Sequence, residues 1–74
     1  MKVGTIVRRW TTKGAKYTID IVKTELGFNS VERTNGDVQA TKVRNTLDEA
    51  LDATLLSVAY AKVFDNRTFQ EVQV

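Results

Sequence analysis

Residues 45–64 read Asn-Thr-Leu-Asp-Glu-Ala-Leu-Asp-Ala-Thr-Leu-Leu-Ser-Val-Ala-Tyr-Ala-Lys-Val-Phe, and this stretch decides the fold. Thr46 and Glu49 have capping-box spacing, in which the threonine hydroxyl accepts from a first-turn N–H and the carboxylate reaches back to the Thr46 N–H. Apolar residues then recur at helical spacing, and Asp65-Asn66 ends the pattern with an asparagine that tolerates left-handed backbone. The stretch is therefore predicted to be the only long helix.

The predicted helix carries two apolar stripes. The first follows one helix face, interrupted by Thr54, and is expected to cover a sheet; its members are Leu47, Ala50, Leu51, Leu55, Val58 and Ala61 or Lys62. The second stripe lies largely outside that face and consists of Ala53, Leu56, Tyr60, Val63 and Phe64. Two coverings of the second stripe are open: the final strand and loops of the same chain, or a partner protein or second copy.

The residues around the helix predict strands. Residues 2–10 are rich in β-branched side chains, and residues 17–22 alternate so that Tyr17, Ile19 and Ile21 share a face toward the helix. Residues 28–34 and 37–43 flank Asn35-Gly36, a pair that favours a type I′ hairpin turn. Residues 67–74 give a last strand, irregular enough to be an edge or bulged strand.

These elements predict one small α+β domain over residues 1–74. Its antiparallel four- to five-stranded sheet, a β-meander, has one α-helix packed on one face, and the order is β-β-β-β-α-β. In the fourth strand, Val38 and Ala40 are expected to share a face.

Composition narrows the function classes. The 74 residues include no cysteine and no histidine, which removes thiolate sites, the commonest zinc ligands and the usual proton-transfer side chain. The four glycines are scattered, so there is no phosphate-binding loop, and the N-terminus lacks an apolar run typical of a signal peptide or membrane span. The expectation is a cytoplasmic, non-enzymatic protein without cofactor or metal.

Charge is divided unevenly along the chain. Residues 1–45 carry nine basic and four acidic side chains, a balance of +5, whereas residues 46–74 carry two basic and five acidic ones, a balance of −3. Asp48, Glu49 and Asp52 lie near the helix start, where carboxylates stabilise the helix dipole. Such an acidic helix end could also dock on a basic groove of a partner.

The first hairpin is the best candidate for nucleic-acid contact. Arg8, Arg9, Lys13 and Lys16 can meet phosphates, and Trp10 among them can stack on a base. Basic residues on short exposed strands also protect sheet edges from aggregation, and a lone tryptophan usually anchors a core. Both interpretations of this patch are open.

Two resemblances accompany these patterns. A basic sheet with a capped helix behind it is similar to the arm-type DNA-binding domains of tyrosine integrases, in which a three-stranded sheet faces DNA. That similarity covers the element order of residues 3–58, and the fourth and last strands depart from it. Residues 46–51, Thr-Leu-Asp-Glu-Ala-Leu, resemble the turn into the helix of a small phage-encoded RNA polymerase inhibitor. No residue role is transferred from either.

The leading hypothesis is a small nucleic-acid-binding protein that uses the basic hairpin. The alternative is a protein-binding inhibitor or adaptor, of the kind that a phage or another mobile element encodes. It would act through the helix surface formed by Leu56, Tyr60, Val63 and Phe64. A homodimer is compatible with both hypotheses.

Overall fold

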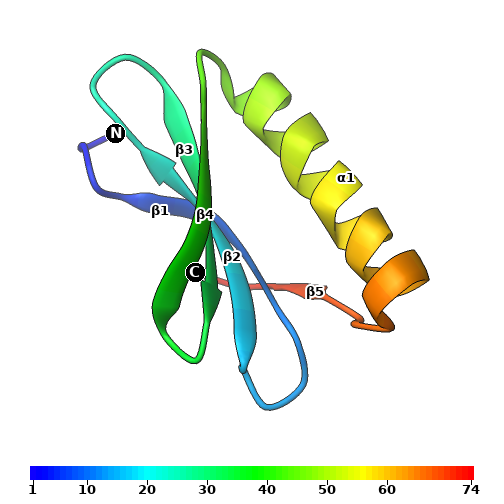
Figure 1. The fold of residues 1–74 in the computed structure, drawn as a ribbon. Coiled ribbons are helices and arrows are strands. Elements are labelled where there is room, and N and C mark those ends of the chain that lie inside the picture. The colour runs from blue at the N-terminus through cyan, green and yellow to red at the C-terminus, as the bar shows by residue number, and fades with distance from the viewer.

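A computed structural model of the chain describes all 74 residues as one antiparallel sheet covered on one face by a single helix (Figure 1). The elements in chain order are β1 (Ile6–Thr11), β2 (Tyr17–Lys23), β3 (Phe28–Thr34), β4 (Asp37–Arg44), α1 (Leu47–Asp65) and β5 (Gln70–Val72). The strand order across the sheet is β4-β3-β2-β1-β5. The predicted α+β class and element order are confirmed.

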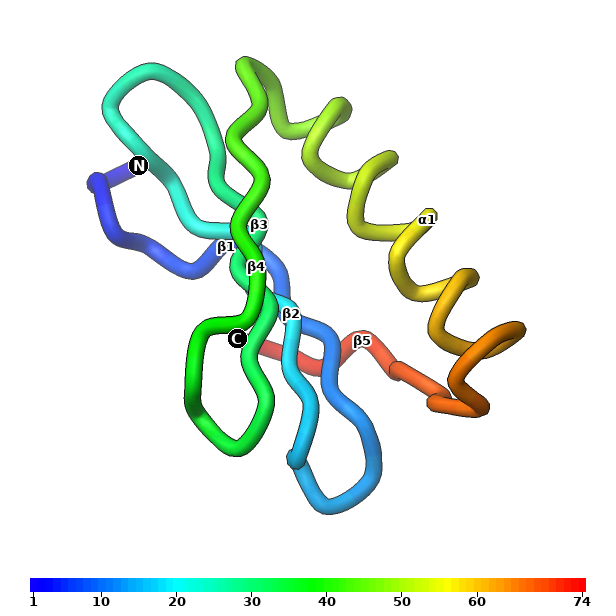
Figure 2. The backbone as a smooth tube through the Cα atoms, in the orientation of Figure 1, coloured from blue at the N-terminus to red at the C-terminus, as the bar shows by residue number.

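The turns between the strands lie at two opposite ends of the molecule (Figure 2). The β1–β2 and β3–β4 turns lie at one end, and the N-terminus, the β2–β3 loop and the start of α1 lie at the other. After α1 the chain returns beneath the helix to the sheet. There β5 pairs with β1 and not with β4, the strand that precedes the helix.

Two strands are shorter than the sequence indicated, and one face assignment was wrong. The first strand begins at Ile6 because Gly4, at φ 90°, makes a turn before it, and the last strand is limited to Gln70–Val72. A register shift in the β3–β4 pairing sets Val38 opposite Arg33 and Ala40 opposite Glu32. Because of this bulge, Val38 and Ala40 lie on opposite faces of the sheet.

The core lies between α1 and the central strands. Ile19 and Ile21 alternate with outward residues along β2, and Trp10 pairs with Ile19 from β1. Ala50 of the helix packs on these three side chains, and its small size lets the helix approach the sheet closely. Partly buried residues surround this cluster: Val7, Phe28, Leu47, Leu51, Val58 and Phe69.

Polar groups fix α1 at its start and in its middle. Thr46 caps the helix by accepting from the Glu49 N–H at 3.2 Å, and its hydroxyl donates to the Glu49 carboxylate, which differs from the predicted return bond to the backbone. Thr54 is buried and donates to the Ala50 carbonyl at 2.8 Å. The Thr54 hydroxyl can then accept from the Ser30 hydroxyl, 3.2 Å away. Thr54, which interrupts the first apolar stripe, therefore links the helix to β3 by a hydrogen bond.

Gly27 sets how closely the β2–β3 loop approaches the β4–α1 junction. A Cβ at this position would lie 2.2 Å from the Arg44 carbonyl oxygen and 3.0 Å from the Asn45 Cα, both of which are backbone atoms. We expect Gly27→Ala to lower the free energy of unfolding by about 2–3 kcal/mol, because the backbone must move to admit the methyl group. Urea denaturation followed by circular dichroism measures the change.

Leu26→Ala is the matched control, since Leu26 is the adjacent residue and is 90% exposed. It should leave the stability unchanged. Wild-type stability in Gly27→Ala would show that the junction adjusts without cost.

Candidate interaction surfaces

The three residues at the centre of the predicted nucleic-acid site do not form one surface. Arg8 and Trp10 lie on the helix side of β1, whereas Arg9 points to the opposite face, as expected for neighbours along a strand. Trp10 is 4% exposed and belongs to the core, so its ring is not available to stack on a base. The alternative that the lone tryptophan anchors the core fits the structure.

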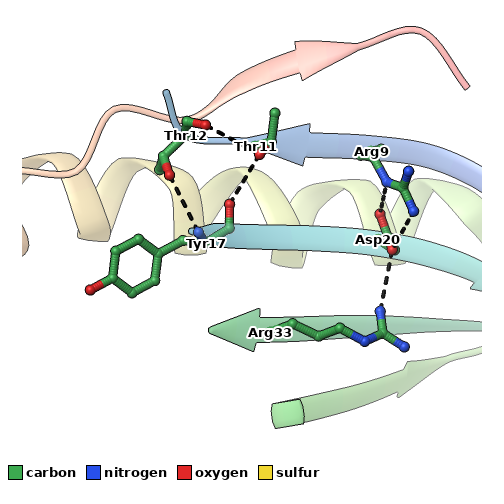
Figure 3. Close-up of polar contacts among 6 residues, drawn as sticks. All are labelled: Arg9, Thr11, Thr12, Tyr17, Asp20 and Arg33. Atoms are coloured by element: carbon green, nitrogen blue, oxygen red, sulfur yellow. Dashed lines mark hydrogen bonds and ion pairs between the residues drawn. The ribbon is translucent and has the colours of Figure 1, made fainter. Parts of the chain in front are cut away.

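Arg9 is held by a carboxylate that bridges three strands (Figure 3). Its guanidinium donates to Asp20 through Nε at 2.6 Å and Nη2 at 3.0 Å, and Arg33 of β3 donates to the same carboxylate at 3.3 Å. The hydrogen bonds from Arg9 to Asp20, together with the negative charge of Asp20, raise the pKa of Arg9. Asp20 is 2% exposed although α1 lies on the other face. The two arginines enclose it and leave one net positive charge on this face.

Arg8 is held in a separate pair at the edge of the sheet. It donates to Glu71 of β5 through both Nε and Nη2, the latter at 2.7 Å, and its guanidinium lies 5.6 Å from the centre of the Trp10 ring. Arg8 and Arg9 therefore bind carboxylates of their own chain on opposite faces. Sequence reasoning missed both partners: Asp20 lies directly opposite Arg9 on the neighbouring strand, and Glu71 comes from the far end of the chain.

The β1–β2 turn keeps its lysines free. Thr11 and Thr12 hydrogen-bond the backbone of Tyr17 across the turn (Figure 3), and Lys13 and Lys16 are exposed. The guanidinium of Arg67 lies 3.9 Å from the Tyr17 ring centre, and the Lys16 ammonium lies 5.4 Å from it. Of the residues predicted to bind nucleic acid, only these two lysines remain exposed without an ion-pair partner.

The second stripe of α1 is uncovered. Leu56, Tyr60, Val63 and Phe64 are between 62% and 73% exposed, and the Tyr60 and Phe64 rings lie 4.4 Å apart against each other. Neither β5 nor any loop covers them, because β5 pairs with β1 at the edge of the sheet opposite β4. Of the two predicted coverings, the one by the chain's own last strand and loops is wrong.

A groove runs beside this stripe, between the C-terminal half of α1 and the sheet. Its volume is about 540 Å³. The helix contributes Leu56, Tyr60 and Ala61 to one wall, and polar side chains that include Glu32 and Lys42 line the sheet side. An apolar wall beside a polar rim is the usual composition of a protein interface.

No group of three or more histidine, cysteine, aspartate or glutamate side chains could hold a metal ion, and no helix is both long and apolar enough to cross a membrane. Asp48 and Glu49 lie in the first turn of α1, and Glu49 takes part in the cap.

No protein family, curated protein or solved structure matches the chain.

The Arg8–Glu71 pair makes the attachment of β5 sensitive to pH. Hydrogen bonds from Arg8 lower the pKa of Glu71 below its ordinary value of 4.5. The pair therefore stabilises β5 fully above pH 4.5, and this contribution is lost as the pH falls through the lower pKa of the folded state. We expect the amide protons of β5 to lose hydrogen-exchange protection in that acidic range, as measured by NMR.

Glu71→Gln supplies the comparison. Its β5 amides should be weakly protected at neutral pH already, and the difference from wild type should vanish below the Glu71 pKa. An equal difference between the two proteins at every pH would show that the pair does not hold the strand.

Proposed function

We propose that this domain is a non-catalytic protein-binding module, an adaptor or inhibitor, whose binding surface is the second stripe of α1. The observation that carries the proposal is the exposure of four large apolar side chains on one helix flank: Leu56, Tyr60, Val63 and Phe64. Single exposed apolar residues are ordinary, but a contiguous patch of this kind typically marks an interface.

The composition of the patch supports the same function. Tyr60 and Phe64 form an aromatic pair, and aromatic side chains contribute strongly to binding energy at the centre of interfaces. The groove beside them presents charged groups at its rim, among them Lys42 and Arg67, which can fix the orientation of a partner. Such a module would act by occupying a surface of its partner.

Substitutions in the stripe test the proposal because they leave the core intact. Leu56→Asp and Tyr60→Ala should fold normally, and each should weaken partner binding at least tenfold, as expected when a central apolar anchor is removed. Immobilised wild-type protein first captures its partner from a cell extract, and titration calorimetry with the purified partner then measures each affinity.

Leu26→Asp is the control, because it introduces the same charge at an exposed leucine in the β2–β3 loop. Equal affinities for wild type, Leu56→Asp and Tyr60→Ala would rule out the stripe as the binding surface.

A second candidate function, nucleic-acid binding, is favoured by the uncovered sheet face and the turn beside it. Arg9 and Arg33 bring a net positive charge to that face, and the exposed Lys13 and Lys16 extend it at the β1–β2 turn. Lysines in this position can neutralise phosphates without reading sequence. Trp10 would not contact the nucleic acid, because its side chain is buried in the core.

The paired substitution Lys13→Ala and Lys16→Ala measures that contribution. The double variant should weaken binding and reduce the slope of log affinity against log salt by roughly two, because two phosphates are no longer neutralised. Fluorescence anisotropy with duplex DNA, single-stranded DNA and RNA at low salt gives both quantities. Lys62→Ala, on the helix, is the control, and no binding of any probe by wild-type protein would exclude this function.

A further inference from the structure

We infer that the second stripe binds the same stripe of a second copy of the chain, so that two α1 helices pack antiparallel in a symmetric dimer. This inference rests on the proposed function, because it names the partner of the proposed binding surface. The spacing of the exposed residues, the charges at the ends of the stripe and the available area each support it.

The spacing of the stripe fits a helix as its occupant. Ala53, Leu56, Tyr60 and Val63 follow one another at intervals of three, four and three residues, which is the spacing of the apolar positions in a coiled coil. This line of residues returns to the same side of the helix at every turn. A second helix packing along it would contact all four side chains.

Charges at the two ends of the stripe favour the antiparallel arrangement. Glu49 and Asp52 lie at its N-terminal end. Lys62 and Arg67 lie at its C-terminal end, where Arg67 is also 3.8 Å from Asp65, so the two ends are net negative and net positive. With the two-fold axis near the middle of the helix, Glu49 of one copy approaches Arg67 of the other, and the helix dipoles oppose each other. A parallel pair would bring the same carboxylates together, which costs energy.

The exposed apolar area is enough for a weak dimer. Each of the four large exposed side chains offers on the order of 100 Å² to a partner, since a whole aromatic side chain presents about 150–250 Å². Pairing two copies would bury about 800 Å² from these eight side chains, which is just under the lower limit of about 1,000 Å² for a stable specific interface. The expected dimer is therefore weak and dependent on concentration.

Sedimentation velocity over a range of protein concentrations tests self-association. The wild-type protein should shift from the 8.3 kDa monomer to twice that mass as concentration rises. Leu56→Arg should remain monomeric, with an unchanged circular dichroism spectrum. Leu26→Arg should dimerise as wild type does, because Leu26 is exposed in the β2–β3 loop and outside the stripe.

Engineered cysteines test the orientation, because the natural chain has none. In the double variant Ala53→Cys and Val63→Cys, mild oxidation should join position 53 of one copy to position 63 of the other. The two positions are about 15 Å apart along one helix, too far for a bond within one chain. Mass spectrometry of the digested product identifies the linkage.

The outcomes separate this inference from the proposed function. Disulfides joining 53 to 53 and 63 to 63 would overturn the antiparallel arrangement. A wild-type protein that stays monomeric at all concentrations would overturn self-association, and in that case a loss of heterologous binding in Leu56→Asp would leave the proposed function intact. Failure of both experiments would reject the stripe as an interface of any kind.

Discussion

One helix must cover a five-stranded sheet, and this mismatch in width governs the rest of the structure. The buried core side chains come from β1, β2 and the start of α1, where Ala50 allows a close approach. The helix contacts β2, β3 and β4, but every residue of β4 from Asp37 to Val43 is exposed. The exposed apolar flank of α1 and the exposed strand β4 thus have the same cause: the chain has no second helix to cover them.

Most strong polar interactions of this domain serve the assembly of the sheet. Asp20 joins β1 and β3 to β2 through Arg9 and Arg33, and Glu71 joins β5 to β1 through Arg8. Breaking the pairs of Asp20 would leave a buried carboxylate without its partners, which is more costly than the net gain from forming the pairs. These arginines are therefore positioned by the fold, and the basic balance of the first 45 residues overstates the charge that is free to meet a ligand.

How much could be predicted from the sequence depends on the range of each interaction. The Thr46 cap, the Asn35-Gly36 turn and the alternation around Ile19 each act within a few residues, and each appears in the structure, although Glu49 accepts from the Thr46 hydroxyl and not from its N–H. Alternation along β1 also implied that Arg8 and its neighbour face opposite sides, a signal that could have been used. The partner of Arg8 could not have been found locally, because Glu71 is 63 residues away. The covering of the outer helix flank and the bulge between β3 and β4 likewise depend on strand pairing, which periodicity does not determine.

The position of β5 also has a consequence for the order of folding. The hairpins β1–β2, β2–β3 and β3–β4 join neighbours in sequence, whereas β5 pairs with β1 across nearly the whole chain and over three residue pairs only. Closing so long a loop costs more chain entropy than closing a hairpin, and few contacts repay it. The meander and helix should therefore form first, and β5 should dock last and open most often, as a cooperative unit less stable than the rest of the domain.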